Sequence, residues 1–572
     1  MLSRRAIAAT YAALALLRIL VAFTSLSSIH PDEHFQNPEI AAPLSFSYAT
    51  TGDRPLRTWE WRGTSPCRSI VPVIGSTGLA FELLNLLLGP SPSATALFAA
   101  QRAVMLLFSF CIDYAVWHVS RRSQLSLLLF ATSPVTFTFL LRPFSNTLET
   151  VLLAIVFLIS IKVSGSARAA SHLPFFFLGV ALAVGIFTRI TFVAFATPLG
   201  LCTAAVVARQ GRSRVLLVAD FPRLVLPGIC TLAGFIGTAA SCIVVDTTYF
   251  SSDKVSIRSG LGALADLSAL VVAPLNLLRY NISSDNLAEH GLHPRWLHVV
   301  VNAPMLFGAG LVIVAAGAAD SLQPARAGLK PFDREALVLY LSTFILPLFA
   351  LSLLPHQEPR FLVPLVLPVA LLAPHTSIFR NATSRARTAR KIVWALWLAH
   401  SVVFTVVFGY LHQGGLVPAT LALNTDLRDP TTRLGAAQEV DAVFWRTFMP
   451  PRHLLLPLAR GAVVPAVHVT DLAGASPSTL LSTLAALHRT ASHIVVVAPA
   501  YAVEAHNLTC LVTPTSAASS GRSDPLDASP EQCLSPLAPN RTSYGVHVDM
   551  DRLGDLGGAT WQTLGVGVWR VE

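Results

Sequence analysis

The chain has 572 residues, of which 53% are hydrophobic and only 13% are charged, and its formal net charge is +10. A soluble protein carries about 25% charged residues, so this composition excludes an ordinary soluble protein and indicates that lipid is the solvent. The positive charges are spread over short loops between apolar runs, which is typical of the positive-inside rule and not of a nucleic-acid-binding patch. The seven cysteines form no CxxC pair and no zinc-like spacing, so we expect no nucleic-acid partner, no metal site and no cofactor.

The N-terminus combines a basic pair with an apolar run long enough to cross a bilayer. Arg4 and Arg5 precede an apolar segment over about residues 6–28, and a transmembrane helix needs ~20 such residues. No credible cleavage site follows, so we interpret the run as a signal anchor with a cytosolic N-terminus. Arg18 lies inside this run, where it either snorkels toward the surface or faces the bundle interior.

An acidic stretch, His30-Pro31-Asp32-Glu33-His34, follows this first span directly. Pro31 cannot continue a hydrogen-bonded helix, so we predict that the chain breaks there and places Asp32 and Glu33 in the first loop. Two adjacent acids in a loop can be ordinary solvated residues. The alternative interpretation is that they form the acidic centre of a membrane-embedded transferase.

Ten further apolar runs predict an all-α polytopic membrane protein with about eleven transmembrane helices. They cover residues 98–119, 124–141, 151–164, 173–207 (two spans), 224–245, 297–318, 336–354, 362–377 and 392–411. Two long loops, 29–97 and 246–296, lie on the far side of the membrane, and Gly75–Leu88 is predicted as an interfacial or re-entrant helix. Loops rich in Arg and Lys fall on the cytosolic side, whereas loops rich in His, Asp, Glu and Asn fall on the other side, where we expect the functional site.

The composition changes after residue 411, so we predict a membrane domain over residues 1–411 and a second domain over residues 412–572. The second part contains Val-rich segments such as 462–470 and 492–499, which are typical of strands, with a short helix at 480–487. Strands that alternate with helices predict a small α/β domain on the far side of the membrane. Residues 513–539 are rich in Ser, Pro and Ala and are predicted to form a flexible loop.

Four glycosylation sequons provide a test of which loops lie on the far side of the membrane. Those at Asn281, Asn507 and Asn540 fall on the far side, whereas the sequon at Asn381 falls on the cytosolic side and is expected to stay unmodified. Cys510 and Cys533 could pair, because the far-side compartment permits disulfides.

The far-side loops gather acids, arginines and histidines. A transfer reaction with a phosphate leaving group needs a carboxylate that takes the proton from the acceptor hydroxyl and cations that stabilise the departing phosphate. A transporter pathway is lined with the same groups, but a secondary transporter would favour inverted repeats and acids near the bilayer midplane. The sequence shows no repeat, and its acids lie at one face. Histidine and glutamate pairs could instead bind a metal, but no spacing such as HExxH is present.

Four segments of the chain resemble glycosyltransferase family 22, the endoplasmic reticulum mannosyltransferases that use dolichyl-phosphate mannose. The segments are His30–Gln36, Arg68–Pro72, Arg142–Thr150 and His356–Phe361. The version His-Gln-Glu-Pro-Arg-Phe, together with Asn286–Pro294 and Leu411–Gly415, resembles the branch that adds a fourth mannose to the glycosylphosphatidylinositol (GPI) precursor. These matches run from residue 30 to about residue 415.

The resemblance implies a GT-C fold in the endoplasmic reticulum membrane, with a lumenal active site and a lumenal C-terminal domain. It further implies transfer of mannose from dolichyl-phosphate mannose to the third mannose of the GPI precursor, in α-1,2 linkage and with inversion. A sister enzyme that uses the same donor and acts on another GPI or N-glycan intermediate is the nearest alternative. A multi-span secondary transporter and a non-catalytic assembly subunit are alternatives from other classes.

The resemblance also assigns roles to individual residues. Asp32 is the expected general base, and Glu33 is the alternative that the sequence does not exclude. A guanidinium matches phosphate geometry, so Arg360 either grips the donor phosphate or anchors the end of a span. The expected substrate-binding residues are His34, Arg68, Arg189, His290, His293, His356, Glu358 and Arg360.

Overall fold

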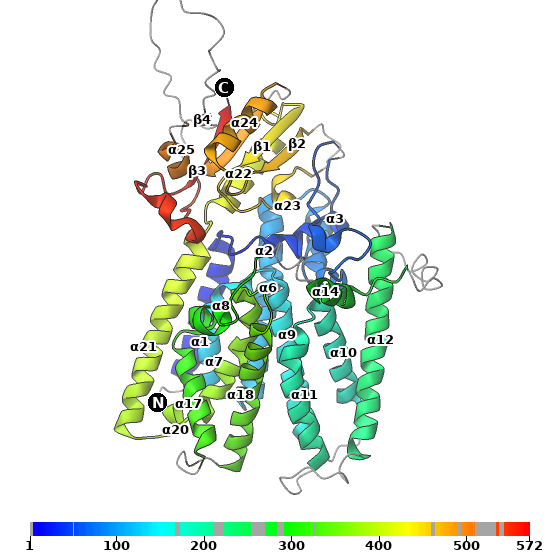
Figure 1. The fold of residues 1–572 in the computed structure, drawn as a ribbon, viewed down its shortest axis with the longest axis vertical. Helices are drawn as coiled ribbons and strands as arrows, with labels where there is room; N and C mark the ends of the chain where they lie inside the picture. The colour runs from blue at the N-terminus through cyan, green and yellow to red at the C-terminus, as the bar shows by residue number, and fades with distance from the viewer. Residues whose placement is uncertain are drawn as a thin grey trace, which may run out of the picture. The chain divides into compact units, whose positions relative to one another are not determined.

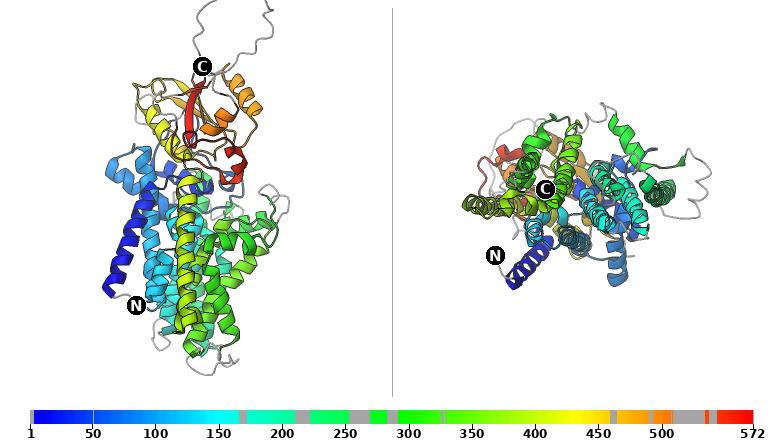
Figure 2. Two further views of the ribbon diagram at one scale, coloured as in Figure 1. Left: turned by 90° about the vertical axis from the view of Figure 1, so that its left-hand side faces the viewer. Right: turned by 90° about the horizontal axis from the view of Figure 1, so that it is seen from below.

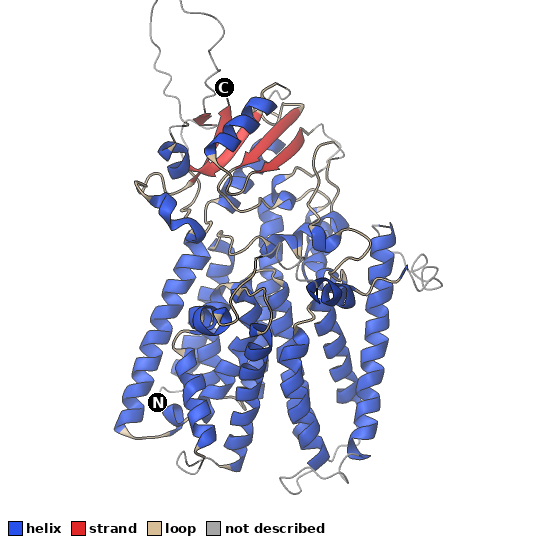
Figure 3. Cartoon of the chain, viewed as in Figure 1, coloured by secondary structure: helices blue, strands red, loops and turns tan. Residues whose placement is uncertain are grey.

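The computed structural model describes residues 4–571 apart from positions 50, 166–171, 210–221, 253–268, 283–290, 325–327, 329, 459–463, 490–492, 507, 509–533 and 537–542. Helices make up most of the described chain, and a small sheet is built near the C-terminus (Figure 3). The chain divides into two compact units. The first, here called the bundle unit, comprises residues 1–22, 57–80 and 101–405. The second, the head unit, comprises residues 23–56, 81–100 and 406–571 of the described chain.

This division by contacts differs from a single change of domain along the chain. The head unit begins at Val406, near the expected change at residue 412, but it also includes two N-terminal segments. One of them contains the acidic stretch around Asp32.

The bundle unit consists of long apolar helices that run side by side (Figures 1 and 2). Its helices, with the ends that continue into the head unit, are α1 (Arg4–Thr24), η1 (Trp59–Trp61), α4 (Val71–Val73), η2 (Ile74–Gly78), α6 (Ala94–Val119), α7 (Gln124–Ala131), α8 (Pro134–Phe137), η3 (Phe139–Leu141), α9 (Ser145–Gly165), α10 (Leu173–Thr188), α11 (Phe192–Arg209), α12 (Pro222–Ser252), α14 (Ala273–Ile282), η6 (His298–Asn302), α16 (Ala303–Phe307), α17 (Gly310–Leu322), α18 (Pro331–Ser352), η7 (Pro359–Leu365), α19 (Val366–Leu372), η8 (Ala373–His375), α20 (Ser377–Arg380) and α21 (Ser384–Val406). Helix α5 (Leu79–Leu88) begins in the bundle unit and lies mostly in the head unit.

Among the described residues, seven helices are long and apolar enough to cross a membrane, or nine if each of two bent pairs is one span. The bent pairs are Gln124–Ala131 with Pro134–Leu141, at 50°, and His298–Phe307 with Gly310–Leu322, at 115°. The polytopic all-α prediction is therefore confirmed, with fewer full-length spans than the expected eleven.

The difference in number has a local cause. Three expected spans form shorter apolar helices, namely Leu173–Thr188, Phe192–Ala208 and Pro359–His375. Arg189 adopts an extended conformation and separates the first two, and prolines divide the third into 3₁₀ and α segments. Conversely, Gly75–Leu88, expected as a short interfacial helix, is part of an 18-residue run, Val71–Leu88, that meets the length of a span.

Arg18 faces the bundle interior and does not snorkel. Its guanidinium lies 2.7 Å from Asp113 of α6, and both side chains are buried. Tyr11 donates a hydrogen bond of 2.7 Å to the same carboxylate, and the ring of Phe110 lies 5.1 Å from the Arg18 guanidinium carbon. A paired buried charge is the form in which ionisable residues are tolerated at membrane depth, so this cluster fixes α1 to α6.

The head unit is built around a five-stranded sheet of order β2-β1-β3-β5-β4. Its strands are β1 (Glu439–Phe444), β2 (Ala466–Asp471), β3 (Ile494–Pro499), β4 (Leu534–Pro536) and β5 (Val566–Val571). Strand β1 pairs in parallel with β2 and β3, whereas β5 is antiparallel to β3 and β4. Its helices are α2 (Asp32–Phe35), α3 (Pro38–Ser45), η9 (Val407–Leu411), α22 (Leu416–Arg428), α23 (Arg452–Leu455), α24 (Pro477–Leu487), α25 (Ala500–Ala505) and η10 (Met550–Leu556).

The sheet separates two apolar layers, because successive side chains of a strand point to opposite faces. Val440, Ala442 and Phe444 pack with α22 on one face. Val443 and Val496 pack with α24 and α25 on the other face. The predicted small α/β domain is therefore confirmed, with β2, β3 and α24 close to their expected positions.

Several predictions concern residues outside the described part of the chain. They are the pairing of Cys510 with Cys533, the sequons at Asn507 and Asn540, the substrate role of His290, and most of the loop expected over 513–539.

Candidate active site

The acidic stretch of the head unit forms a short helix immediately after Pro31. Pro31 adopts helical angles, and α2 covers Asp32–Phe35, so the chain makes a helical turn where a plain loop was expected. The two acids differ in exposure. The side chain of Asp32 is 24% exposed, whereas that of Glu33 is buried and accepts a hydrogen bond of 3.3 Å from the backbone N–H of Ile29.

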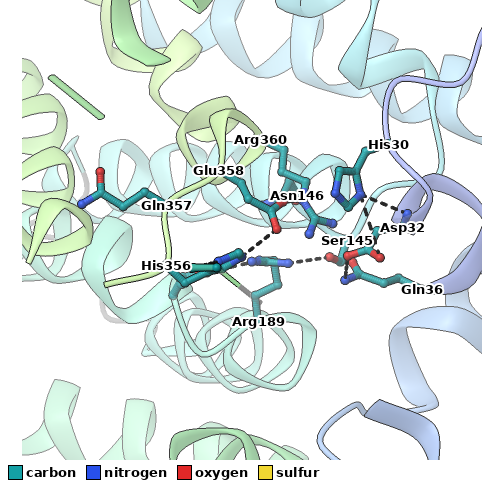
Figure 4. A network of polar contacts seen from close by, with 12 residues as sticks. His30, Asp32, Gln36, Ser145, Asn146, Arg189, His356, Gln357, Glu358 and Arg360 are labelled. Atoms are coloured by element: carbon teal, nitrogen blue, oxygen red, sulfur yellow. Dashed lines mark hydrogen bonds and ion pairs between the residues drawn. The ribbon is translucent and has the colours of Figure 1, made fainter. Parts of the chain in front are cut away.

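Two neighbours on the same turn, His30 and Gln36, contact Asp32 (Figure 4). The side-chain amide of Gln36 donates to Oδ2 of Asp32. Nδ1 of His30 accepts a hydrogen bond of 3.2 Å from the backbone N–H of Asp32 and lies 3.9 Å from its Oδ1. Because Nδ1 acts as an acceptor there, a neutral His30 carries its proton on Nε2.

A second acid, Glu39 of α3, ties this stretch to the sheet-bearing part of the head unit. One of its oxygens, Oε2, contacts both Nδ1 and the backbone N–H of His453, at 2.6 and 3.0 Å. The other oxygen accepts a hydrogen bond of 2.7 Å from the backbone N–H of Leu56. His34 is buried beside this pair, with its ring centroid 5.8 Å from that of His453.

In the bundle unit, two predicted arginines meet on the ring of Phe361. The guanidinium carbons of Arg189 and Arg360 lie 5.0 and 5.6 Å from the ring centroid, which is cation–π distance. Arg189 follows the end of α10 and donates a hydrogen bond of 2.9 Å to Ser145 at the start of α9. Its Nε lies 3.6 Å from Glu149 of the same helix.

The sequence His356-Gln357-Glu358-Pro359-Arg360 folds into a compact charge network (Figure 4). Glu358 joins Arg360 and His356, and Nε2 of His356 lies 2.7 Å from Oε1 of the carboxylate. Burial by itself lowers the pKa of His356, but the hydrogen bond and the charge of Glu358 outweigh it, so the pKa is raised above its ordinary value.

Gln357 and His293 hold this network in place through the backbone. The side-chain oxygen of Gln357 accepts a hydrogen bond of 2.8 Å from the backbone N–H of His298. His293 accepts from the N–H of Gln357 at 3.2 Å and donates its own N–H to the carbonyl of Pro355 at 2.8 Å. His293 therefore positions the segment that carries His356.

Arg68 is a third arginine that acts on the region of Arg189 and Arg360. It forms hydrogen bonds of 2.9 and 2.6 Å with one oxygen of Glu60, while Asp246 of α12 accepts from Ser69 and from the N–H of Ile70, each at 2.9 Å. Burial lowers the pKa of Arg189 to about 10, and the charges of Arg68 and Arg360 contribute to the shift. Three guanidinium groups thus act on one region, and each of them lies beside a carboxylate.

The bundle unit therefore brings together most of the predicted substrate-binding residues, namely Arg68, Arg189, His293, His356, Glu358 and Arg360. Asp32, Glu33 and His34 lie in the head unit, and His290 lies outside the described residues. Sequence reasoning did not identify Glu60, Phe361, Glu39 or His453 as partners, although Glu60 and Phe361 stand next to residues that it did select. The described residues contain no group of three or more His, Cys, Asp or Glu arranged to hold a metal ion.

Known proteins resemble this chain in sequence and in fold. A relative from Homo sapiens, GPI alpha-1,2-mannosyltransferase 4, is 32% identical over 521 residues, 85% of this chain and 82% of the relative. GPI mannosyltransferase 4 of Emericella nidulans is 33% identical over 469 residues, 78% of this chain and 76% of that protein.

The fold has a solved counterpart. The crystal structure of ArnT from Cupriavidus metallidurans bound to undecaprenyl phosphate aligns with a TM-score of 0.50 and 12% identity, over 99% of this chain and 98% of ArnT. This likeness confirms the predicted GT-C fold. The family model of the Alg9-like mannosyltransferases matches residues 9–457, and with that match the resemblance is confirmed: the chain belongs to the Alg9-like mannosyltransferase family.

Proposed function

We propose that this protein transfers mannose from dolichyl-phosphate mannose to the third mannose of the GPI precursor, in α-1,2 linkage. The observation that carries the proposal is the match, over 85% of the chain, to a human relative whose name states a GPI α-1,2-mannosyltransferase activity. Undecaprenyl phosphate, the ligand in the ArnT structure, belongs to the same chemical class of polyprenyl phosphates as the carrier of the proposed donor.

In the proposed reaction, Asp32 is the general base. Its carboxylate takes the proton of the acceptor hydroxyl while that oxygen forms a bond to C1 of mannose and the bond from C1 to the phosphate oxygen breaks. A single displacement converts the β-linked donor into an α-linked product and needs no covalent enzyme intermediate. The partial exposure of Asp32 supports this choice over Glu33, whose buried carboxylate already accepts a backbone hydrogen bond.

The arginines of the bundle unit are proposed to hold the phosphate of the donor. As the glycosidic bond breaks, the negative charge on the departing dolichyl phosphate grows, and fixed guanidinium groups stabilise it without reorganisation. Arg360 and Arg189 are prepared for this role because Glu358, Ser145 and the ring of Phe361 orient them. Glu358 and His356 are assigned to positioning and to hydrogen bonding of the sugar or phosphate.

The test of this function is the profile of lipid-linked precursors in cells that lack the protein. Accumulation of a GPI precursor with three mannoses, reversed by the wild-type chain, is the expected result. Accumulation of an earlier GPI intermediate or of an N-glycan precursor would assign the chain to a sister reaction. An unchanged lipid profile would remove it from this chemistry altogether.

The proposed location is the endoplasmic reticulum membrane, with a cytosolic N-terminus and a lumenal active site and C-terminal domain. Asn281 lies in the last turn of α14, and Asn381 is exposed between α20 and α21. We expect glycan on Asn507 or Asn540 and none on Asn381. Endoglycosidase shifts of single-sequon variants measure this, and a glycan on Asn381 would overturn the assignment of sides from that loop onward.

A further inference from the structure

Two large apolar side chains on the head unit are exposed beside the end of a membrane span. Leu553 of η10 is 51% exposed, and Trp561, in the turn after η10, is 79% exposed. In the described part of residues 412–571, the one other exposed large apolar residue is Leu481 of α24. Single exposed apolar residues are normal on soluble domains. Whether Leu553 and Trp561 mark an interaction site therefore depends on the residues around them.

The backbone before η10 is hydrogen-bonded to the end of the span Ser384–Leu411. The N–H of Val548 donates to the carbonyl of Leu411 at 2.9 Å, and the N–H of Gln413 donates back to the carbonyl of Val548 at 3.1 Å. The N–H of Met550, the first residue of η10, donates to Nδ1 of His412 at 3.3 Å.

The length of that helix places its end at the level of the lipid headgroups. The span Ser384–Leu411 has 28 residues, which at 1.5 Å per residue is about 42 Å. The hydrocarbon core of a bilayer is about 30 Å thick and the whole bilayer about 40–45 Å. A residue bonded to the end of this helix therefore lies at the boundary between lipid and water, where tryptophan is enriched.

Trp561 lies in a turn whose backbone is fixed by packing and by hydrogen bonds. Leu556 and Leu564, which flank Trp561, pack against the core of the sheet. The turn that carries Trp561 is closed by hydrogen bonds from the N–H of Thr563 and the N–H of Leu564 to the carbonyl of Thr560, at 3.0 and 3.1 Å. The exposure of Trp561 is thus a property of a defined turn.

The charges of this stretch indicate which lipids it would contact. Asp555 is paired with Arg446 at 2.9 Å, and Asp549 accepts the N–H of Asp551 at 3.0 Å. The side chain of Asp551 is exposed, and the stretch has no cluster of basic residues of the kind that binds anionic lipids. An apolar and slightly acidic surface suits zwitterionic phospholipid.

We propose that residues 550–561 form a membrane-interface anchor. In this inference the indole of Trp561 and the side chain of Leu553 insert at the headgroup boundary of zwitterionic phospholipid and hold the head unit against the bilayer. The inference rests on the membrane character of the chain, on the length of the span Ser384–Leu411 and on the head unit, so it is independent of the proposed reaction.

The test places a photoactivatable benzophenone side chain at position 561 of the full-length protein, which is reconstituted in phosphatidylcholine nanodiscs. The same side chain at position 481 is the matched control, because Leu481 is an exposed leucine of α24 in the same unit. After illumination, mass spectrometry of the protein measures covalent lipid adducts. We expect several-fold more phosphatidylcholine adduct at 561 than at 481.

Equal adduct yields at the two positions would overturn the inference. So would adducts at position 561 that join two protein chains and contain no lipid, because the turn would then be a protein interface. A second measurement exchanges one fifth of the phosphatidylcholine for phosphatidylserine. The adduct yield at 561 should not rise, whereas a several-fold rise would show that charge attraction and not apolar insertion brings lipid to the turn.

Discussion

Three carboxylates of the bundle unit and two of the head unit differ in the side chains that they contact. In the bundle unit, Glu60, Glu149 and Glu358 each lie beside an arginine. In the head unit, Asp32 contacts a histidine and an amide, and Glu39 contacts a histidine. An acid that contacts a guanidinium orients it, whereas the acid on the partly exposed turn is the one that we propose to take up the proton of the acceptor hydroxyl. We propose that the first three carboxylates position arginines and that Asp32 is the base, and four experiments test this proposal.

The largest effect is expected from Asp32→Asn. The substitution keeps the size of the side chain and its contact with Gln36, but an amide cannot accept the proton of the acceptor hydroxyl. We expect transfer from dolichyl-phosphate mannose to a three-mannose GPI acceptor in microsomes to fall at least ~10²-fold, as is typical when a general base is removed. The abundance of the protein should not change.

Glu33→Gln is the matched control, because it changes the neighbouring acid in the same way. A smaller loss of transfer activity in Glu33→Gln than in Asp32→Asn would support Asp32 as the base. An inactive Glu33→Gln beside an active Asp32→Asn would move the base by one residue, and two active variants would remove this turn from the chemistry.

The next effect is on the stability of the head unit. His453→Ala leaves Glu39 buried with a missing partner, and breaking a buried pair in this way costs about 3–5 kcal/mol. We expect less protein in membranes and faster proteolysis near residues 38–56. His468→Ala removes the same residue type from an exposed pair with Glu439, where about 0–1 kcal/mol is expected. Equal losses of stability in His453→Ala and His468→Ala would show that burial does not determine how much each histidine–glutamate pair stabilises the protein.

Arg360→Lys tests the positioning role of the bundle carboxylates. Lysine keeps the charge but loses the planar group that meets Glu358 and the ring of Phe361. Loss of a charged hydrogen bond of about 1.5–3 kcal/mol corresponds to a roughly 10- to 100-fold lower transfer rate at normal protein level. Arg62, an exposed arginine of the same unit, provides the control Arg62→Lys, which should transfer normally. Wild-type turnover by Arg360→Lys would exclude Arg360 from donor binding.

The smallest effect concerns pH. Because the pKa of His356 is raised above its ordinary 6.5, its protonated form stabilises the fold fully below about pH 6.5. That contribution is lost as the pH rises through the folded-state pKa. The melting temperature of His356→Asn should thus approach that of the wild type as pH increases. In a Glu358→Gln background, the difference in melting temperature between the protein with His356 and its His356→Asn variant should no longer depend on pH. A difference that is independent of pH in the wild-type background would contradict the pairing of His356 with Glu358.

Apolar run length predicted the order and the approximate positions of most membrane helices, because transfer into lipid depends mainly on composition. It failed where a helix is interrupted, since a hydropathy window does not register the extended conformation of Arg189 or the prolines between residues 359 and 368. Family-like segments selected Arg68, Arg360 and the histidines of the bundle unit as site candidates, and the loop between two apolar runs supplied Arg189. They did not identify partners, because Glu149 with Arg189 and Glu39 with His453 are long-range contacts with no local periodicity.

The contact between Glu39 and His453 also sets an order of events during synthesis. The two residues are 414 positions apart in the chain. At 5–20 residues per second, the second one leaves the ribosome roughly 20–80 s after the first. During that time the segment around Asp32 has been synthesised, but His453, the hydrogen-bond partner of Glu39, has not. A chain that stops before residue 453 lacks this partner. The segment that carries the proposed catalytic turn therefore gains its contact with His453 only after about four fifths of the chain has been synthesised.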